Sequence, residues 1–193
     1  FFDTISNDDL GIWLGKVYLA MRENRHAYVM CDAITLPYFY YYAGFRKPCS
    51  PCIYLDNGGV VPFANMKPLI WDKVSMGMGY HYRCRYEFIV MLDKGKNRHL
   101  ANLSIPDVLE FPSVQGKEKL CPTQKPLRLF ELLIRQSTIE GELVLDAFLG
   151  SGTTAVACKK LNRKCIAYEL NEERCEIAAN RCRQTVMEVN CDG

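Results

Sequence analysis

The residues best suited to chemistry lie where an apolar strand runs into a glycine-rich turn. Residues 143–155 read LVLDAFLGSGTTA, so Asp146 ends the strand and Gly150 and Gly152 follow it closely. A turn without Cβ atoms lets a ligand lie against the backbone at the carboxyl end of the strand, facing a helix N-terminus. Together with Ala155, the two glycines fit the G-x-G-x-x-G/A pattern of nucleotide-binding turns.

A second acidic residue, Glu169, follows Gly152 by 17 residues, at the end of the next apolar run. A carboxylate there can accept hydrogen bonds from both ribose hydroxyls of an adenosine. Both NAD and S-adenosylmethionine (SAM) contain that adenosine, so the spacing alone leaves both open. Asp146 favours SAM, because an anion at the strand tip attracts ammonium and sulfonium charges and repels a pyrophosphate. For the glycines alone, a plain strand-to-helix turn is the alternative.

Two motifs resemble a known family, the bacterial and phage DNA amino-methyltransferases. The segment DAFLGSGTT at 146–154 resembles their D-P-F-x-G-S-G-T-T cofactor motif, with Ala147 in place of the usual proline. The segment CPTQKP at 121–126 resembles their H-P-T-Q-K-P segment, with Cys121 in the histidine's place. This order resembles the β arrangement of the family. Shorter likenesses at 71–73, 78–80 and 86–89 extend the resemblance to most of the chain except about 47–68.

The resemblance implies a doubly wound α/β fold with a mostly parallel sheet, of the Rossmann-like SAM-dependent methyltransferase type. It implies a reaction in which a base amino nitrogen attacks the methyl group of SAM in line, with adenine N6 favoured over cytosine N4 on family frequency only. For Lys125 alone, a solvated lysine at a helix start is the alternative reading. The implied cofactor-binding residues are Thr123, Lys125, Pro126, Asp146, Phe148, Gly150, Ser151, Gly152, Thr153, Thr154, Glu169 and Asn171.

The family's catalytic motif, an Asp, Asn or Ser followed by Pro-Pro and an aromatic residue, is absent from this sequence. Its oxygens accept hydrogen bonds from the target amino group, and its ring stacks on the flipped base. The nearest imitation, TLPY at 35–38, lacks the acceptor and the first proline and fits a helix start. In the β arrangement the motif precedes residue 8, so we expect it upstream of Phe1 in a longer protein, and the catalytic residues stay unknown.

A loop at 75–85 combines glycines, aromatic residues and arginines. Its tyrosines can stack on a displaced base and its arginines can contact phosphates, although a solvated connector is an equal alternative. The candidate DNA-binding residues are Tyr80, Tyr82, Arg83 and Arg85. The segment CSPC at 49–52 has zinc-knuckle spacing, but no second C-x-x-C or His pair complements it, so no metal site is expected.

The elements that must position these residues follow from hydrophobic periodicity and from turn signals. Helices are expected at 8–23, 35–43 with Gly44 as its stop, 125–136, 152–161 and 171–187. Strands are expected at 26–31, 69–73, 86–92, 142–146 and 164–169, with an irregular insertion at 47–68. The alternation after residue 122 predicts a parallel sheet with helices on both faces.

Composition sets the broad limits. A chain of 193 residues fits one α/β domain spanning 1–193, and its net charge of +2 requires any nucleic-acid surface to be a local patch. Ten scattered cysteines indicate reduced thiols and a cytoplasmic protein, and no apolar run is long enough for a membrane span. Double-stranded DNA is the expected partner, and a homodimer is compatible with the sequence. The rival functions are a catalytically inactive methyltransferase-like subunit that binds DNA and an NAD-dependent oxidoreductase.

Overall fold

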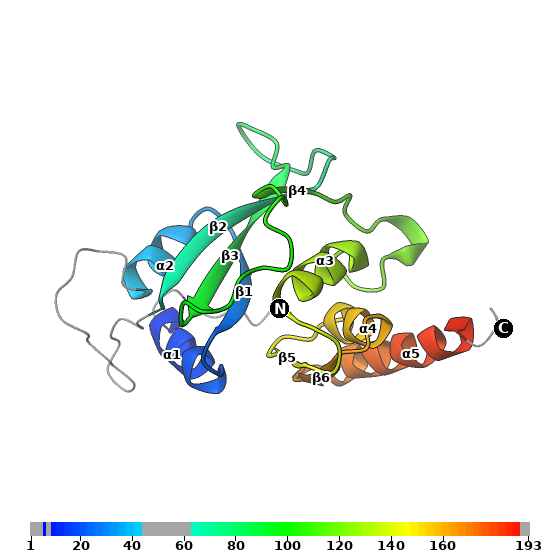
Figure 1. The fold of residues 1–193 in the computed structure, drawn as a ribbon. Helices are drawn as coiled ribbons and strands as arrows, with labels where there is room; N and C mark the ends of the chain where they lie inside the picture. Colours follow the sequence, from blue (N-terminus) through cyan, green and yellow to red (C-terminus); the bar gives the residue numbers. More distant parts are fainter. Residues whose placement is uncertain (1–5, 7–8, 44–62, 190–193) are drawn as a thin grey trace. The chain divides into compact units, whose positions relative to one another are not determined.

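The computed structural model describes residues 6, 9–43 and 63–189, which belong to two compact units (Figure 1). The first unit contains Phe1–Asp72, Cys84–His99 and Pro106–Leu109. The second unit contains Lys73–Arg83, Leu100–Ile105 and Glu110–Gly193.

A four-stranded sheet in the order β1-β3-β2-β4 is the centre of the first unit. Its strands are β1 (Arg25–Cys31), β2 (Asn65–Asp72), β3 (Tyr86–Lys94) and β4 (Val108–Glu110). Strand β3 pairs antiparallel with β1 on one side and with β2 on the other. Because β3 is central, its run from Ile89 to Leu92 is buried and reads as continuously apolar.

Two helices, α1 (Leu10–Ala20) and α2 (Leu36–Tyr42), complete the core of this unit. Leu14 of α1, Phe39 of α2 and Leu92 of β3 are fully buried in one cluster. Lys94 holds the end of α1, since its Nζ donates hydrogen bonds to the carbonyl oxygens of Tyr18 and Met21, both at 2.9 Å. These carbonyls lie at the C-terminal end of α1, where a cation also interacts favourably with the helix dipole.

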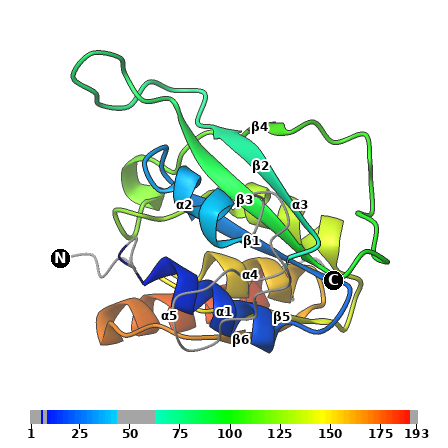
Figure 2. The same ribbon diagram turned by 90° about the vertical axis from the view of Figure 1, so that its left-hand side faces the viewer.

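The second unit contains a parallel strand pair, β5 (Leu143–Asp146) and β6 (Lys164–Ala167). Helix α4 (Thr153–Lys160) connects the two strands, and it packs against α3 (Leu127–Ser137) and α5 (Glu172–Val189) (Figures 1 and 2). A short 3-10 helix, η1 (Gly116–Glu118), precedes α3. The unit therefore has the β-α-β order that brings the carboxyl ends of β5 and β6 to the same edge.

The α/β class is confirmed, and the expected helices and strands within the described residues are confirmed to within a few residues at each end. Three findings differ in detail from the sequence-based picture. Strand β3 pairs antiparallel with both of its neighbours, whereas a mostly parallel sheet was expected, and the described parallel pair is β5 with β6. Strand β4 and the 3-10 helix η1 were not expected.

The expected irregular insertion at 47–68 needs a correction at its end, because β2 already begins at Asn65 and contains Pro68. Strand β4 has only three residues, so part of β2 lies at the sheet edge, where a proline without an N–H group is tolerated. The remainder of the insertion up to residue 62, the expected stop at Gly44 and the cysteines of the CSPC segment lie outside the described residues.

Two general properties can be stated for the described part of the chain. None of its helices combines the length and apolar character that crossing a membrane requires. Each of its seven cysteines is a free thiol.

Gly152 is a position where the fold of the second unit leaves no room for a side chain. Its φ is +86°, and an added Cβ would lie 2.7 Å from Ala178 Cβ and 2.9 Å from Ala178 Cα, on α5. We expect Gly152→Ala to lower the free energy of unfolding by about 3 kcal/mol, because a strained backbone and an overpacked helix contact add up. Urea denaturation followed by circular dichroism measures this change.

Gly141→Ala is the matched control, because Gly141 also has a positive φ, +79°, but nothing lies within 4 Å of the added Cβ. It isolates the backbone cost, which is about 1 kcal/mol. Equal destabilisation by the two substitutions would show that the contact between α4 and α5 is not the constraint.

Candidate functional site

The turn between β5 and α4 is tied together by the side chain of Asp146. Its Oδ1 accepts a hydrogen bond of 2.9 Å from the backbone N–H of Phe148, and its Oδ2 accepts one from the hydroxyl of Thr154. Asp146 thus joins the end of the strand, the start of the turn and the first turn of the helix.

Glu169 approaches the same turn from the neighbouring strand. Its Oε2 accepts a hydrogen bond of 2.8 Å from Gly150 N–H, and its Oε1 accepts one of 3.0 Å from Asn171 N–H. The backbone adds a further link, since Leu149 N–H donates to Tyr168 O at 2.9 Å. Each carboxylate oxygen can accept more than one hydrogen bond, so Glu169 keeps capacity for additional donors.

The surroundings of Gly150 leave space beside the turn. Gly150 has a φ of +55°, and an added Cβ would approach only Phe148 O, at 4.0 Å. The Phe148 side chain is 55% exposed. A flat or hydrogen-bonding ligand can therefore lie against this backbone, which is the property expected of a glycine at this point.

The structure also brings the segment 121–126 to the glycine turn. The hydroxyl of Thr153 donates to Lys125 O at 3.3 Å, and the thiol of Cys121 lies 3.8 Å from Thr123 Oγ1. Burial raises the pKa of the Cys121 thiol, but hydrogen bonds from Ser151 and Thr123 outweigh it and leave that pKa below its ordinary value. The two motifs, which are separate in the sequence, form one local arrangement.

Arg181 is a member of this arrangement that sequence analysis missed. Its Nη1 donates to the Ser151 carbonyl oxygen at 2.7 Å, to Ser151 Oγ at 3.1 Å and to Thr153 Oγ1 at 3.4 Å. Desolvation lowers the pKa of the Arg181 guanidinium, which nevertheless stays charged at neutral pH. Arg181 follows Ser151 by 30 residues along the chain, and no local motif marks it.

Among the expected cofactor-binding residues, Asn171 has an evident structural task. Its Oδ1 accepts a hydrogen bond of 3.0 Å from Arg174 N–H, the geometry of a residue that caps the N-terminus of α5. A contact between Asn171 and a cofactor therefore stays a prediction. Of the expected residues in the other motif, Pro126 is buried, Lys125 is half-buried and Thr123 is exposed.

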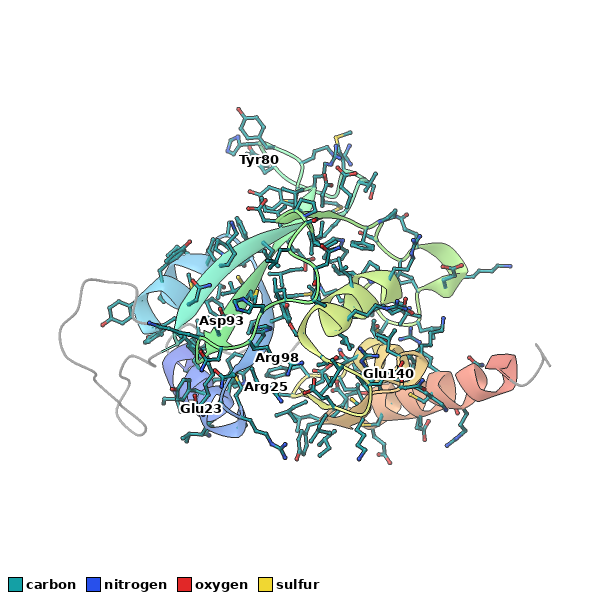
Figure 3. The ribbon with its side chains drawn as sticks, in the orientation of Figure 1. Glu23, Arg25, Tyr80, Asp93, Arg98 and Glu140 are labelled. Atoms are coloured by element: carbon teal, nitrogen blue, oxygen red, sulfur yellow. The ribbon has the colours of Figure 1, made fainter. Side chains whose placement is uncertain are left out.

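The aromatic and basic loop at 75–85 presents its tyrosines to solvent. Tyr80 and Tyr82 are 96% and 91% exposed, and Figure 3 shows Tyr80 at the tip of its loop. Arg83 Nε donates to Gly77 O at 3.0 Å within the loop. In the first unit, Arg85 Nε forms an ion pair with Asp72 Oδ1 at 2.7 Å. Both arginines therefore have contacts within the protein, and their contact with DNA stays a prediction.

Curated proteins with similar sequences are methyltransferases by name. The type II methyltransferase M.HpaI of Haemophilus parainfluenzae is 50% identical over 78 residues, which cover 39% of this chain and 25% of that protein. The type II methyltransferase M2.DpnII of Streptococcus pneumoniae is 34% identical over 116 residues, which cover 58% of this chain and 40% of that protein. The chain thus matches less than half of the length of either relative.

Solved structures share the fold. The crystal structure of the M1.HpyAVI-SAM complex is 28% identical and has a TM-score of 0.69, covering 91% of this chain and 83% of that chain. The putative DNA modification methylase TTHA0409 of Thermus thermophilus is 20% identical and has a TM-score of 0.62, covering 93% of this chain and 77% of that chain. The expected Rossmann-like fold is thereby confirmed.

A family-level match covers most of the sequence. The family described as DNA methylase, which comprises N6 and N4 methyltransferases, matches residues 8–180. The match includes both sequence motifs and every element from α1 to the first half of α5. The chain belongs to the DNA methylase family.

Proposed function

We propose that this chain binds SAM and is part of a DNA methyltransferase that modifies an exocyclic base amino group, with adenine N6 favoured over cytosine N4. The observation that carries the proposal is the pair of carboxylates, Asp146 and Glu169, which hold one glycine turn from neighbouring strand ends. The family match supports it, as do the type II methyltransferase relatives and the structural neighbour in complex with SAM.

The residues at the turn fit the chemistry of SAM. The remaining acceptor capacity of Glu169 suits two ribose hydroxyls, while the charge of Asp146 suits the ammonium and sulfonium groups. The open space at Gly150 allows close approach to the backbone. The same charge at Asp146 disfavours a pyrophosphate, and together with the family match this argues against the NAD-dependent alternative.

SAM, when bound, supplies a methyl group that its sulfonium centre activates for attack. The contribution of this chain is to fix the position of that group, which lowers the entropic part of the barrier. The turn can do so because it is held on three sides, by Asp146, by Glu169 and, through Ser151 and Thr153, by Arg181. The residue that accepts the hydrogen bonds of the target amino group stays unassigned.

Double-stranded DNA is the proposed partner, and the cytoplasm is the proposed location. The exposed tyrosines of the 75–85 loop are the proposed base contacts, because aromatic rings that are not packed in a core can stack on displaced bases. A homodimer belongs to the same proposal. The catalytically inactive, DNA-binding subunit is the alternative within the family.

The charge of Asp146 can be tested by comparing two ligands. Asp146→Asn keeps the shape of the side chain but removes its charge, so it should weaken binding of SAM more than binding of S-adenosylhomocysteine, whose sulfur is neutral. We expect the dissociation constant of SAM to rise about tenfold and that of S-adenosylhomocysteine to rise about threefold or less. Isothermal titration calorimetry measures both constants, and NAD is titrated in parallel.

Glu172→Gln is the matched control, because it removes a carboxylate from the exposed first turn of α5. Its SAM affinity should equal that of the unchanged protein. Equal losses for both ligands in the Asp146→Asn protein, or tight binding of NAD without binding of SAM, would contradict the assignment.

The role of the exposed loop can be tested with Tyr80→Ala combined with Tyr82→Ala. Loss of stacking should weaken binding to DNA that contains an unpaired base by about tenfold, because base stacking on an aromatic residue contributes about 1–3 kcal/mol. Fluorescence anisotropy measures the affinity. Tyr38→Ala, an exposed tyrosine of α2, is the control, and an equal effect of the control would exclude a specific role of the loop.

Methyl transfer itself is tested by expressing the complete gene in cells that lack other DNA methylation. Long-read sequencing of their DNA reports the modified base and its sequence context together. We expect N6-methyladenine within one short motif. Unmodified DNA, together with a protein that binds SAM and DNA, would instead support the inactive subunit.

A further inference from the structure

We propose that Cys158 and Cys165 are a modification site, at which a hydroperoxide converts the two thiols into a disulfide that links α4 to β6. The two cysteines are seven residues apart in the sequence, on a helix and on the strand that follows it. The effect of this disulfide on cofactor binding rests on the function proposed above, whereas the formation of the disulfide does not.

The short connection between α4 and β6 brings the two cysteines close to each other. Arg163 N–H donates to Cys158 O at 2.8 Å, which closes a tight connection from the helix into β6. Each of the two thiols shifts the pKa of the other, as neighbouring groups do. Cys165 also packs against the buried cluster that contains Cys158, Ala157 and Leu161. The surroundings therefore hold both sulfur atoms in place before any oxidation.

The contact makes the two thiols unequal. The hydrogen bond from Cys158 lowers the pKa of Cys165, although burial and Asp146 oppose this. The same hydrogen bond, burial and Asp146 raise the pKa of Cys158, while Arg163 has a smaller opposite effect. Cys165 is half-buried and Cys158 is 1% exposed. Because the thiolate is the reactive form, Cys165 is the thiol that an oxidant meets first.

The chemistry balances with one hydroperoxide as the oxidant. The Cys165 thiolate attacks the peroxide, the O–O bond breaks, and an alcohol or water leaves, which gives a sulfenic acid at Cys165. The Cys158 sulfur then attacks the Cys165 sulfur, the S–O bond breaks, and a water molecule leaves. Two thiols have lost two electrons in total, and the peroxide has gained them.

The disulfide would act on the glycine turn through short connections. An S–S bond is about 2.05 Å long, so the two sulfur atoms must move closer than a hydrogen bond allows. Cys158 lies one helical turn after Thr154, whose hydroxyl binds Asp146. Cys165 pairs with Val144 in β5, and its strand leads to Glu169. Tightening α4 against β6 thus displaces the supports of both carboxylates.

The experiment compares the full-length protein before and after treatment with tert-butyl hydroperoxide. Mass spectrometry of a non-reducing digest detects the peptide that contains Cys158 linked to Cys165. Calorimetry with SAM then gives the affinity of the reduced, oxidised and re-reduced protein. We expect to detect the linked peptide. SAM binding should be about tenfold weaker after oxidation, a change typical of coupling between two sites, and dithiothreitol should restore it fully.

Cys165→Ser and, as a second variant, Cys158→Ala should bind SAM normally and become insensitive to the peroxide. Cys84→Ser, which removes an exposed thiol in the first unit, should respond as the unchanged protein does. Absence of the linked peptide would overturn the proposal. It would also be overturned if peroxide lowered the SAM affinity of Cys165→Ser as much as that of the unchanged protein, because the sensitive thiol would then be Cys121 or another cysteine. If the reduced protein does not bind SAM at all, the proposed function fails, while the linked peptide still decides on the disulfide.

Discussion

The turn between β5 and α4 contains backbone N–H groups that neither a strand nor a helix can satisfy, and this constraint organises the second unit. An N–H group that leaves water without gaining a partner costs about as much free energy as a lost hydrogen bond, and Leu149 and Gly150 of this turn are partly buried whereas Phe148 is exposed. Here Asp146 accepts from Phe148, Glu169 accepts from Gly150, and Tyr168 O accepts from Leu149. The two acids therefore stabilise the turn itself, apart from the ligand binding that is proposed for them. Their negative charge also lies near the N-terminus of α4, where the helix dipole favours it.

The supports of this turn come from three directions. The end of strand β6 leads into Glu169, the segment before α3 supplies Lys125 O, and α5 supplies Arg181. Glu169 and Arg181 contribute charged groups, and Lys125 contributes a backbone carbonyl. A ligand that binds such a turn does not have to order it first, which reduces the entropic cost of binding.

Sequence analysis succeeded where local chemistry decides the structure. Strand β5, the glycine turn, α4 and β6 follow one another along the chain, and their spacing places Asp146 and Glu169 at one edge without knowledge of any distant contact. It failed where the deciding partner is remote. Arg181 has no local signal, and the first residues of β2, Asn65 to Pro68, pair with β3, which lies further along the chain. The antiparallel pairing of β3 likewise depends on non-local neighbours.

The close approach of Gly152 to Ala178 restricts how this protein can change over evolutionary time. With 2.7 Å between a new Cβ and the methyl group of Ala178, neither position can gain volume by itself. A larger residue at one of them would need a shift of α5, and that shift would carry Arg181 away from Ser151. We therefore expect these two places to accept only the smallest amino acids, which leaves the other faces of α5 for mutational change.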